Sequence, residues 1–127
     1  YMRHQSARLG KMFVDHLPEY GMEAFALGAF MMSACLFATL LFHPASIAEA
    51  LQLDPLIRRC LMGLAMGTTA MSIVYSPWGQ QSGAHLNPAL TLTYWRLGKV
   101  TSTDAIAYAT AHFVGGLSGM CLAILLM

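Results

Sequence analysis

Hydrophobic residues gather along this chain in three long runs, which shorter polar segments separate. The first run extends from Met22 to Phe42 and contains one charged residue, Glu23. An apolar helix of about 20 residues crosses a hydrocarbon core of roughly 30 Å, so the pattern predicts a membrane span at about residues 22–42. His43-Pro44 ends this span, because proline disfavours helical backbone in the residue before it.

The second run extends from Leu61 to Tyr75 and is short for a span, which needs about 20 residues. It predicts a helix at about residues 60–76. The segment Ser76-Pro77-Trp78-Gly79 has the residues of a turn and stops this helix.

The third run extends from Asp104 to Met127 and is uncharged from Ala105 onward. It predicts a span at about residues 104–127 that is truncated, because it stops in an apolar stretch, and we expect both ends of the chain to be cut. Small residues in a membrane helix let a neighbouring backbone approach closely. The glycines of this run are Gly115, Gly116 and Gly119.

The segment from Ser82 to Gly98, between the second and third runs, is too short and too polar to span a membrane. Asn87 is a favoured N-cap, and Pro88 suits the first helical turn because its missing N–H is not needed there. Gly98 closes the helix. A helix at about residues 87–97 covers roughly 15 Å, half of a bilayer. We therefore predict a re-entrant half-helix that starts near the midplane and returns to its own side.

Composition supports a membrane environment. Hydrophobic residues make up 57% of the chain and charged residues 10%, whereas soluble domains have about 25% charged residues. The net charge of +1 and the absence of a basic run give no sign of a nucleic-acid partner. The three cysteines follow no metal-binding or redox spacing, and we interpret them as packing residues. They are Cys35, Cys60 and Cys121.

The positions of the basic residues predict the orientation of the chain. If the first span leads outward, five basic residues fall on one side: Arg3, Arg8, Lys11, Arg96 and Lys99. Only Arg58 and Arg59 fall on the other. Cytoplasmic loops carry the excess of Lys and Arg, so residues 1–20 are predicted to form a cytoplasmic segment.

Three residues precede the half-helix cap in a conformation that we expect to be non-helical: Gly83, Ala84 and His85. Irregular backbone at membrane depth is tolerated only in protein or beside a water-filled cavity. Facing a lumen, their carbonyl groups would accept hydrogen bonds from permeating molecules, and Asn87 would offer its amide N–H. The partial positive charge of the helix N-terminus repels cations. This combination favours neutral, hydrogen-bonding solutes.

The sequence Ser82 to Thr91, SGAHLNPALT, resembles the first signature loop of the aquaporin and glycerol-facilitator (major intrinsic protein) family. The resemblance implies an all-α membrane fold of six spans and two half-helices in inverted repeats. Residues 21–127 resemble the first repeat only, with three spans and one half-helix. The family also implies a multi-pass protein of a bacterial-type plasma membrane, a homotetramer, and a channel without enzymatic activity or cofactor.

The same resemblance suggests roles for individual residues. The pore residues would be Gly83, Ala84, His85, Asn87, Pro88 and Ala89. Glu23 would accept hydrogen bonds from the backbone of the re-entrant loop; alternatively, it is an interfacial carboxylate in water. His85 would brace the loop or touch permeating molecules. His112 stands where the family often carries Gln. It would support the loop; alternatively, it is an ordinary core histidine.

The family narrows its pore with a residue of the second span, about twenty positions before the Asn of the signature loop. Ungapped counting leads to Gly67, which would leave the constriction wide. If Ser76 to Gln80 is an insertion, the position moves to Met62. The sequence leaves both alternatives open.

Three functions remain to be compared. The first is a passive channel for water, glycerol or a similar small neutral solute. The second is a non-conducting fragment, or a half-channel that needs a second, inverted repeat to form a pore. The third is a membrane enzyme or haem protein that uses His85 and His112, although no nucleophile–base pair or metal spacing supports it.

Overall fold

The structure is a computed structural model that describes residues 10, 11 and 13–127. The described part is all helical, as predicted. Its helices are α2 (Leu17–Phe42), α3 (Ile47–Ala50), α4 (Pro55–Val74), α5 (Pro77–Ser82), α6 (Pro88–Arg96) and α7 (Ser102–Leu126). Arg3 and Arg8 lie outside the described residues, as do residues 1–9 and 12 of the predicted cytoplasmic segment 1–20.

Helix α2 starts earlier than Met22 and ends at the predicted place. Pro18 lies in its first turn. Proline is tolerated there because the backbone N–H that it lacks would have no partner within the helix. His43 has extended backbone with φ −67° and ψ 139°, so the helix stops at Phe42, before the His43-Pro44 pair.

Helix α4 also starts earlier than the apolar pattern indicates. The Asp54 side chain accepts a hydrogen bond from the Leu56 backbone N–H over 2.7 Å, and Pro55 occupies the first turn. Asp followed by Pro is a helix-start signal, and it places Arg58 and Arg59 inside the helix. Arg58 bonds to Glu49 over 2.6 Å and thereby ties α4 to α3.

The predicted turn at residues 76–79 is wrong, because this segment starts the short helix α5. Ser76 is its N-cap and accepts a hydrogen bond from the Gly79 N–H over 3.0 Å, and Pro77 lies in the first turn. Gly79 lets α5 fold back against the end of α4. A Cβ atom on Gly79 would lie 2.1 Å from the Ile73 carbonyl oxygen.

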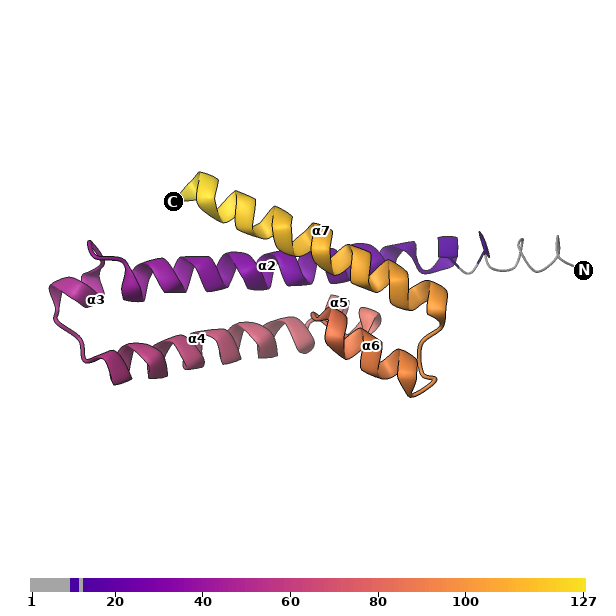
Figure 1. Cartoon of the computed structure of the whole chain (residues 1–127), viewed down its shortest axis with the longest axis horizontal. Helices are drawn as coiled ribbons and strands as arrows, with labels where there is room; N and C mark the ends of the chain where they lie inside the picture. Colours follow the sequence, from indigo (N-terminus) through magenta and orange to yellow (C-terminus); the bar gives the residue numbers. More distant parts are fainter. Residues whose placement is uncertain (1–9, 12) are drawn as a thin grey trace, which may run out of the picture.

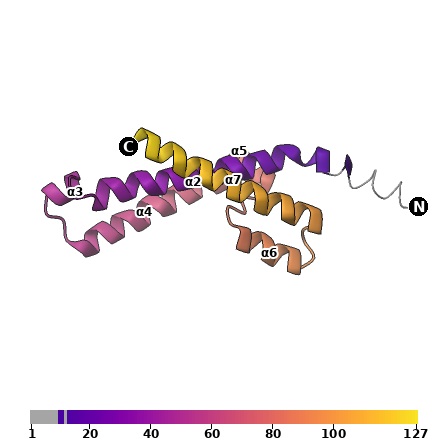
Figure 2. The same cartoon turned by 45° about the horizontal axis from the view of Figure 1, so that its top comes forward.

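Helix α7 crosses over α2 in close contact (Figures 1 and 2), as the glycines of the third run predict. A Cβ on Gly115 would lie 1.9 Å from the Ala24 carbonyl oxygen. A Cβ on Gly119 would lie 2.1 Å from that of Gly28. Only glycine permits this separation of the two backbones.

Among the described residues, two segments are long and apolar enough to cross a membrane, Leu17–Ala50 and Ser102–Leu126. Helix α4 lies along α2 on the side away from the C-terminal half of α7 (Figure 1) and has no buried residue. The short helix α6 packs beside the first half of α7 (Figure 2). The loop between α5 and α6 therefore lies close to both long helices.

Candidate functional site

The half-helix α6 begins with the predicted cap. Asn87 has extended backbone, with φ −157°, and its Oδ1 atom accepts a hydrogen bond from the Ala89 N–H over 2.8 Å. Pro88 occupies the first turn. Arg96 lies in the last turn, and Gly98 follows the end with φ 69°. Asn87 and Ala89 are exposed in this chain, so the start of α6 is open to solvent or to a further segment.

The loop before α6 is non-helical, as predicted, and its backbone is strained. Gly83 has φ 92°, which glycine adopts readily. Ala84 and Leu86 have φ 46° and 54°, in the left-handed region. For a residue with a Cβ this conformation costs about 1–2 kcal/mol. It persists only where the surrounding structure holds it.

Glu23 provides part of that support. Its side chain is fully buried, with 0% exposure, so the interfacial alternative is wrong. Its Oε1 atom accepts hydrogen bonds from the His85 backbone N–H over 2.9 Å and from the Ser82 hydroxyl over 2.7 Å. Its Oε2 atom accepts one from the Leu86 backbone N–H over 2.9 Å. A buried carboxylate is tolerated when donors satisfy it in this way.

His112 supplies the fourth donor to this carboxylate. Its Nε2 atom lies 2.8 Å from Oε2 of Glu23, and both side chains are 0% exposed. An ionised carboxylate only accepts hydrogen bonds, so the proton of His112 lies on Nε2. The Nδ1 atom is buried and has no partner among the described residues.

His85 is packed against two tyrosine rings. Its ring centroid lies 4.9 Å from that of Tyr94 and 4.9 Å from that of Tyr108. Its Nδ1 atom lies 2.9 Å from Oγ1 of Thr91, which is 1% exposed. These contacts favour the bracing interpretation of His85 over direct contact with solutes.

Sequence reasoning missed Thr91 and Tyr108. Thr91 lies one helical turn after the Asn87 cap, on the same face of α6. Tyr108 lies one turn before His112 on α7, and its hydroxyl donates a hydrogen bond to the Ser82 carbonyl over 2.9 Å. The four-residue spacing between Tyr108 and His112 could have indicated that both lie on one face of α7. The contacts of Tyr108 with the loop could not be predicted, because they join residues far apart in the chain.

The two constriction candidates face different ways on α4. Oγ1 of Thr69 lies 2.9 Å from Oγ of Ser33 on α2. Met62 lies about two helical turns before Thr69 and therefore on the same face, toward α2. Successive helical residues rotate by about 100°, so Gly67 lies on the opposite face. A Cβ on Gly67 would have no atom within 4 Å.

A buried carboxylate thus holds a strained loop ahead of a short helix that a side chain caps. Residues 24–127 match the family model described as "Major intrinsic protein". The chain therefore belongs to the major intrinsic protein family, whose members are channels.

Relatives of known sequence support this assignment. A probable aquaporin of Archaeoglobus fulgidus is 34% identical over 61 residues, which are 48% of this chain and 24% of the relative. An aquaglyceroporin of Rhizobium meliloti is 34% identical over 77 residues, which are 61% of this chain and 33% of the relative. Aquaporin Z of Photorhabdus laumondii is 34% identical over 56 residues, 44% of this chain and 24% of the relative. The chain thus spans about a quarter to a third of these relatives. No solved structure matches it significantly.

Proposed function

We propose that this chain acts as a passive transmembrane channel for water or small neutral solutes such as glycerol. The observation that carries the proposal is the set of hydrogen bonds from the loop to Glu23. By binding the N–H groups of His85 and Leu86, Glu23 leaves the loop carbonyl groups free to face a lumen. The relatives named as aquaporins and as an aquaglyceroporin support the same solute class.

The pore centre would form at the start of α6. The carbonyl groups of Gly83, Ala84 and His85 would accept hydrogen bonds from solutes, and the Asn87 amide would donate one. The positive end of the half-helix would oppose cations. Because the Asn87 side-chain oxygen is engaged in the cap, its amide group is oriented for donation. Pro88 and Ala89 complete the turn that exposes it.

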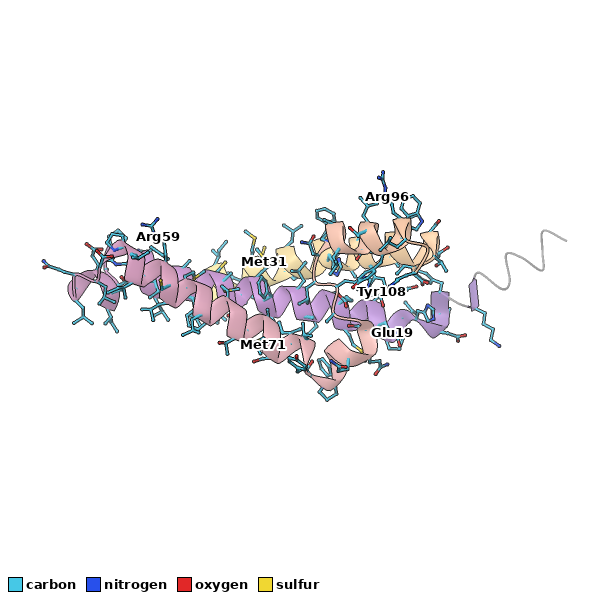
Figure 3. The ribbon with its side chains drawn as sticks, turned by 90° about the horizontal axis from the view of Figure 1, so that it is seen from below. Glu19, Met31, Arg59, Met71, Arg96 and Tyr108 are labelled. Carbon is cyan, nitrogen blue, oxygen red and sulfur yellow. The ribbon has the colours of Figure 1, made fainter. Side chains whose placement is uncertain are left out.

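The membrane arrangement follows from the helices and their charges. We propose that α4 crosses the membrane together with α2 and α7, although its arginines make it less apolar than those two helices. Figure 3 shows Arg59 and Arg96 toward opposite ends of the molecule, which suits a cytoplasmic location for Arg96 and for the N-terminus. The assembly would be a tetramer in a bacterial-type plasma membrane, with lipid against the outer helices.

The open face of Gly67 favours it over Met62 as the constriction residue. Met62 lies on the face of α4 that is turned toward α2, whereas a Cβ on Gly67 would meet no atom within 4 Å. A glycine there would leave the constriction wide and would admit solutes larger than water.

The alternative is a non-conducting fragment, or a half-channel that conducts only with a second, inverted repeat. The exposed start of α6 favours it, because the open end of the half-helix offers room for a facing segment. Swelling assays on proteoliposomes that contain this chain alone, and then the intact protein, separate the two functions.

The test of the pore centre is Asn87→Asp in the intact protein. Aspartate still accepts the cap hydrogen bond from the Ala89 N–H, but places a negative charge at the start of α6. We expect slower water permeation in light-scattering assays and a measurable cation leak. Gln52→Glu, at an exposed position distant from the loop, is the control for the added charge. Unchanged permeability and ion exclusion in Asn87→Asp would contradict the proposal.

A further inference from the structure

Tyr108 contacts several of the residues that surround the loop before α6. Its hydroxyl donates a hydrogen bond to the Ser82 carbonyl over 2.9 Å. Its ring centroid lies 4.9 Å from that of His85, 6.3 Å from that of His112 and 5.4 Å from that of Tyr20 on α2. Figure 3 shows Tyr108 in the layer between α7 and α2, beside the loop.

The loop needs support that Glu23 does not provide. Glu23 holds the N–H groups of His85 and Leu86 from the side of α2. It holds neither the imidazole ring of His85 nor the carbonyl group at the start of the loop. With left-handed backbone at Ala84 and Leu86, on both sides of His85, the loop can relax unless these groups are also fixed.

We propose that Tyr108 is a positioning residue for the pore: its hydroxyl fixes the Ser82 carbonyl, and its ring fixes His85, so that the loop carbonyl groups keep their direction. This inference rests on the proposed channel function. Tyr108 touches no solute and acts through Ser82 and His85.

The hydroxyl has a specific task at the end of α5. The last carbonyl groups of a helix have no partner within the helix. Ser82 is the last residue of α5 and is 5% exposed, so water replaces the phenol poorly as a donor to its carbonyl. Loss of the hydroxyl therefore leaves a buried acceptor unpaired.

Tyr94 provides a matched comparison. Its ring lies at the same centroid distance from His85 as that of Tyr108, 4.9 Å. Among the described residues, no hydrogen bond joins its hydroxyl to the loop. Tyr94→Phe thus removes a phenol hydroxyl beside His85 without removing a donor to the Ser82 carbonyl.

The experiment compares Tyr108→Phe with Tyr94→Phe in the intact protein. Water permeability is measured in proteoliposomes per folded channel, together with its activation energy and with amide hydrogen exchange at His85 and Leu86. For Tyr108→Phe we expect a drop in permeability of about three- to tenfold, the change that loss of one hydrogen bond produces, and faster exchange at both amides. Tyr94→Phe should match the wild type in all three measurements.

Different results separate this inference from the channel function. If Tyr108→Phe conducts as the wild type does and exchanges at the same rate, Tyr108 is not a positioning residue. A change in thermal unfolding alone, with unchanged permeability per folded channel, also overturns the inference, since it shows a merely structural role. If the wild type conducts nothing, the channel function fails, and the two amide exchange rates still test the contact of Tyr108 with the loop.

Discussion

The Nε2 atom of His112 on α7 lies 2.8 Å from Oε2 of Glu23 on α2, and neither side chain is exposed. This contact joins the two long apolar helices at the point where the loop before α6 is bound. Glu23 receives two donors on each of its oxygens, and His112 is the one donor that comes from α7. Position 112 therefore stabilises both the helix pair and the loop.

Replacement of His112 tests this arrangement. His112→Gln keeps an N–H donor for Glu23, so we expect little loss of stability. His112→Leu leaves the buried carboxylate without one donor and should destabilise the protein by about 3–5 kcal/mol, as the loss of one partner of a buried pair does. Thermal unfolding in detergent measures both variants. Equal stability of the two would show that the donor at position 112 is unimportant.

Gly115→Ala should separate α2 from α7. The added Cβ would lie 1.9 Å from the Ala24 carbonyl oxygen, which is backbone and cannot move aside alone. We expect a loss of at least about 1–3 kcal/mol, the usual cost of overpacking, in the same unfolding assay. Gly116→Ala is the control, because its Cβ would meet the Leu27 side chain at an ordinary 3.6 Å. The prediction fails if both alanine variants behave alike.

Gly67→Phe tests the constriction. A large ring on the open face of α4 should reduce glycerol permeability more than water permeability, because the larger solute needs the wider passage. Met62→Phe places a similar ring toward α2 and should leave the ratio of the two permeabilities unchanged. Light-scattering assays with each solute give this ratio. A shift of the ratio in Met62→Phe alone would assign the constriction to Met62.

The contact between His16 and Asp104 should depend on pH. Nδ1 of His16 lies 3.0 Å from Oδ1 of Asp104, and this hydrogen bond is the main reason why the pKa of His16 lies above its usual value of 6.5. Glu19 and Asp15 raise the pKa further, whereas partial burial lowers it. Asp104 also accepts hydrogen bonds from Tyr20 and Thr101, so its carboxylate is held in place for His16.

The direction of this dependence follows from the raised pKa. The contact stabilises the start of α2 fully when His16 is protonated, below its unfolded pKa, and this contribution is lost as the pH rises through the raised value. NMR titration of His16 measures the pKa directly. In Asp104→Asn we expect it to fall toward 6.5. An unchanged midpoint would show that Asp104 does not hold the imidazolium.

Several helix ends could be predicted from the sequence because neighbouring residues determine them. Asn87-Pro88 starts α6, His43-Pro44 stops α2, and Gly98 follows α6 with positive φ. The helix at Pro77 was missed, because a Ser-Pro-Trp-Gly segment suits both a turn and a capped helix. In the structure this segment forms helix α5, and Gly79 packs closely on the Ile73 backbone.

The signature loop and the apolar runs by themselves determined the family, the all-helical class and the position of the half-helix, since these depend on spacing and on local capping. Only the tertiary structure decided which side chains hold the loop. Glu23 meets His85 across 62 positions of sequence and His112 across 89, and Tyr108 meets Ser82 across 26. Such contacts depend on how closely α7 packs on α2, which no local pattern specifies.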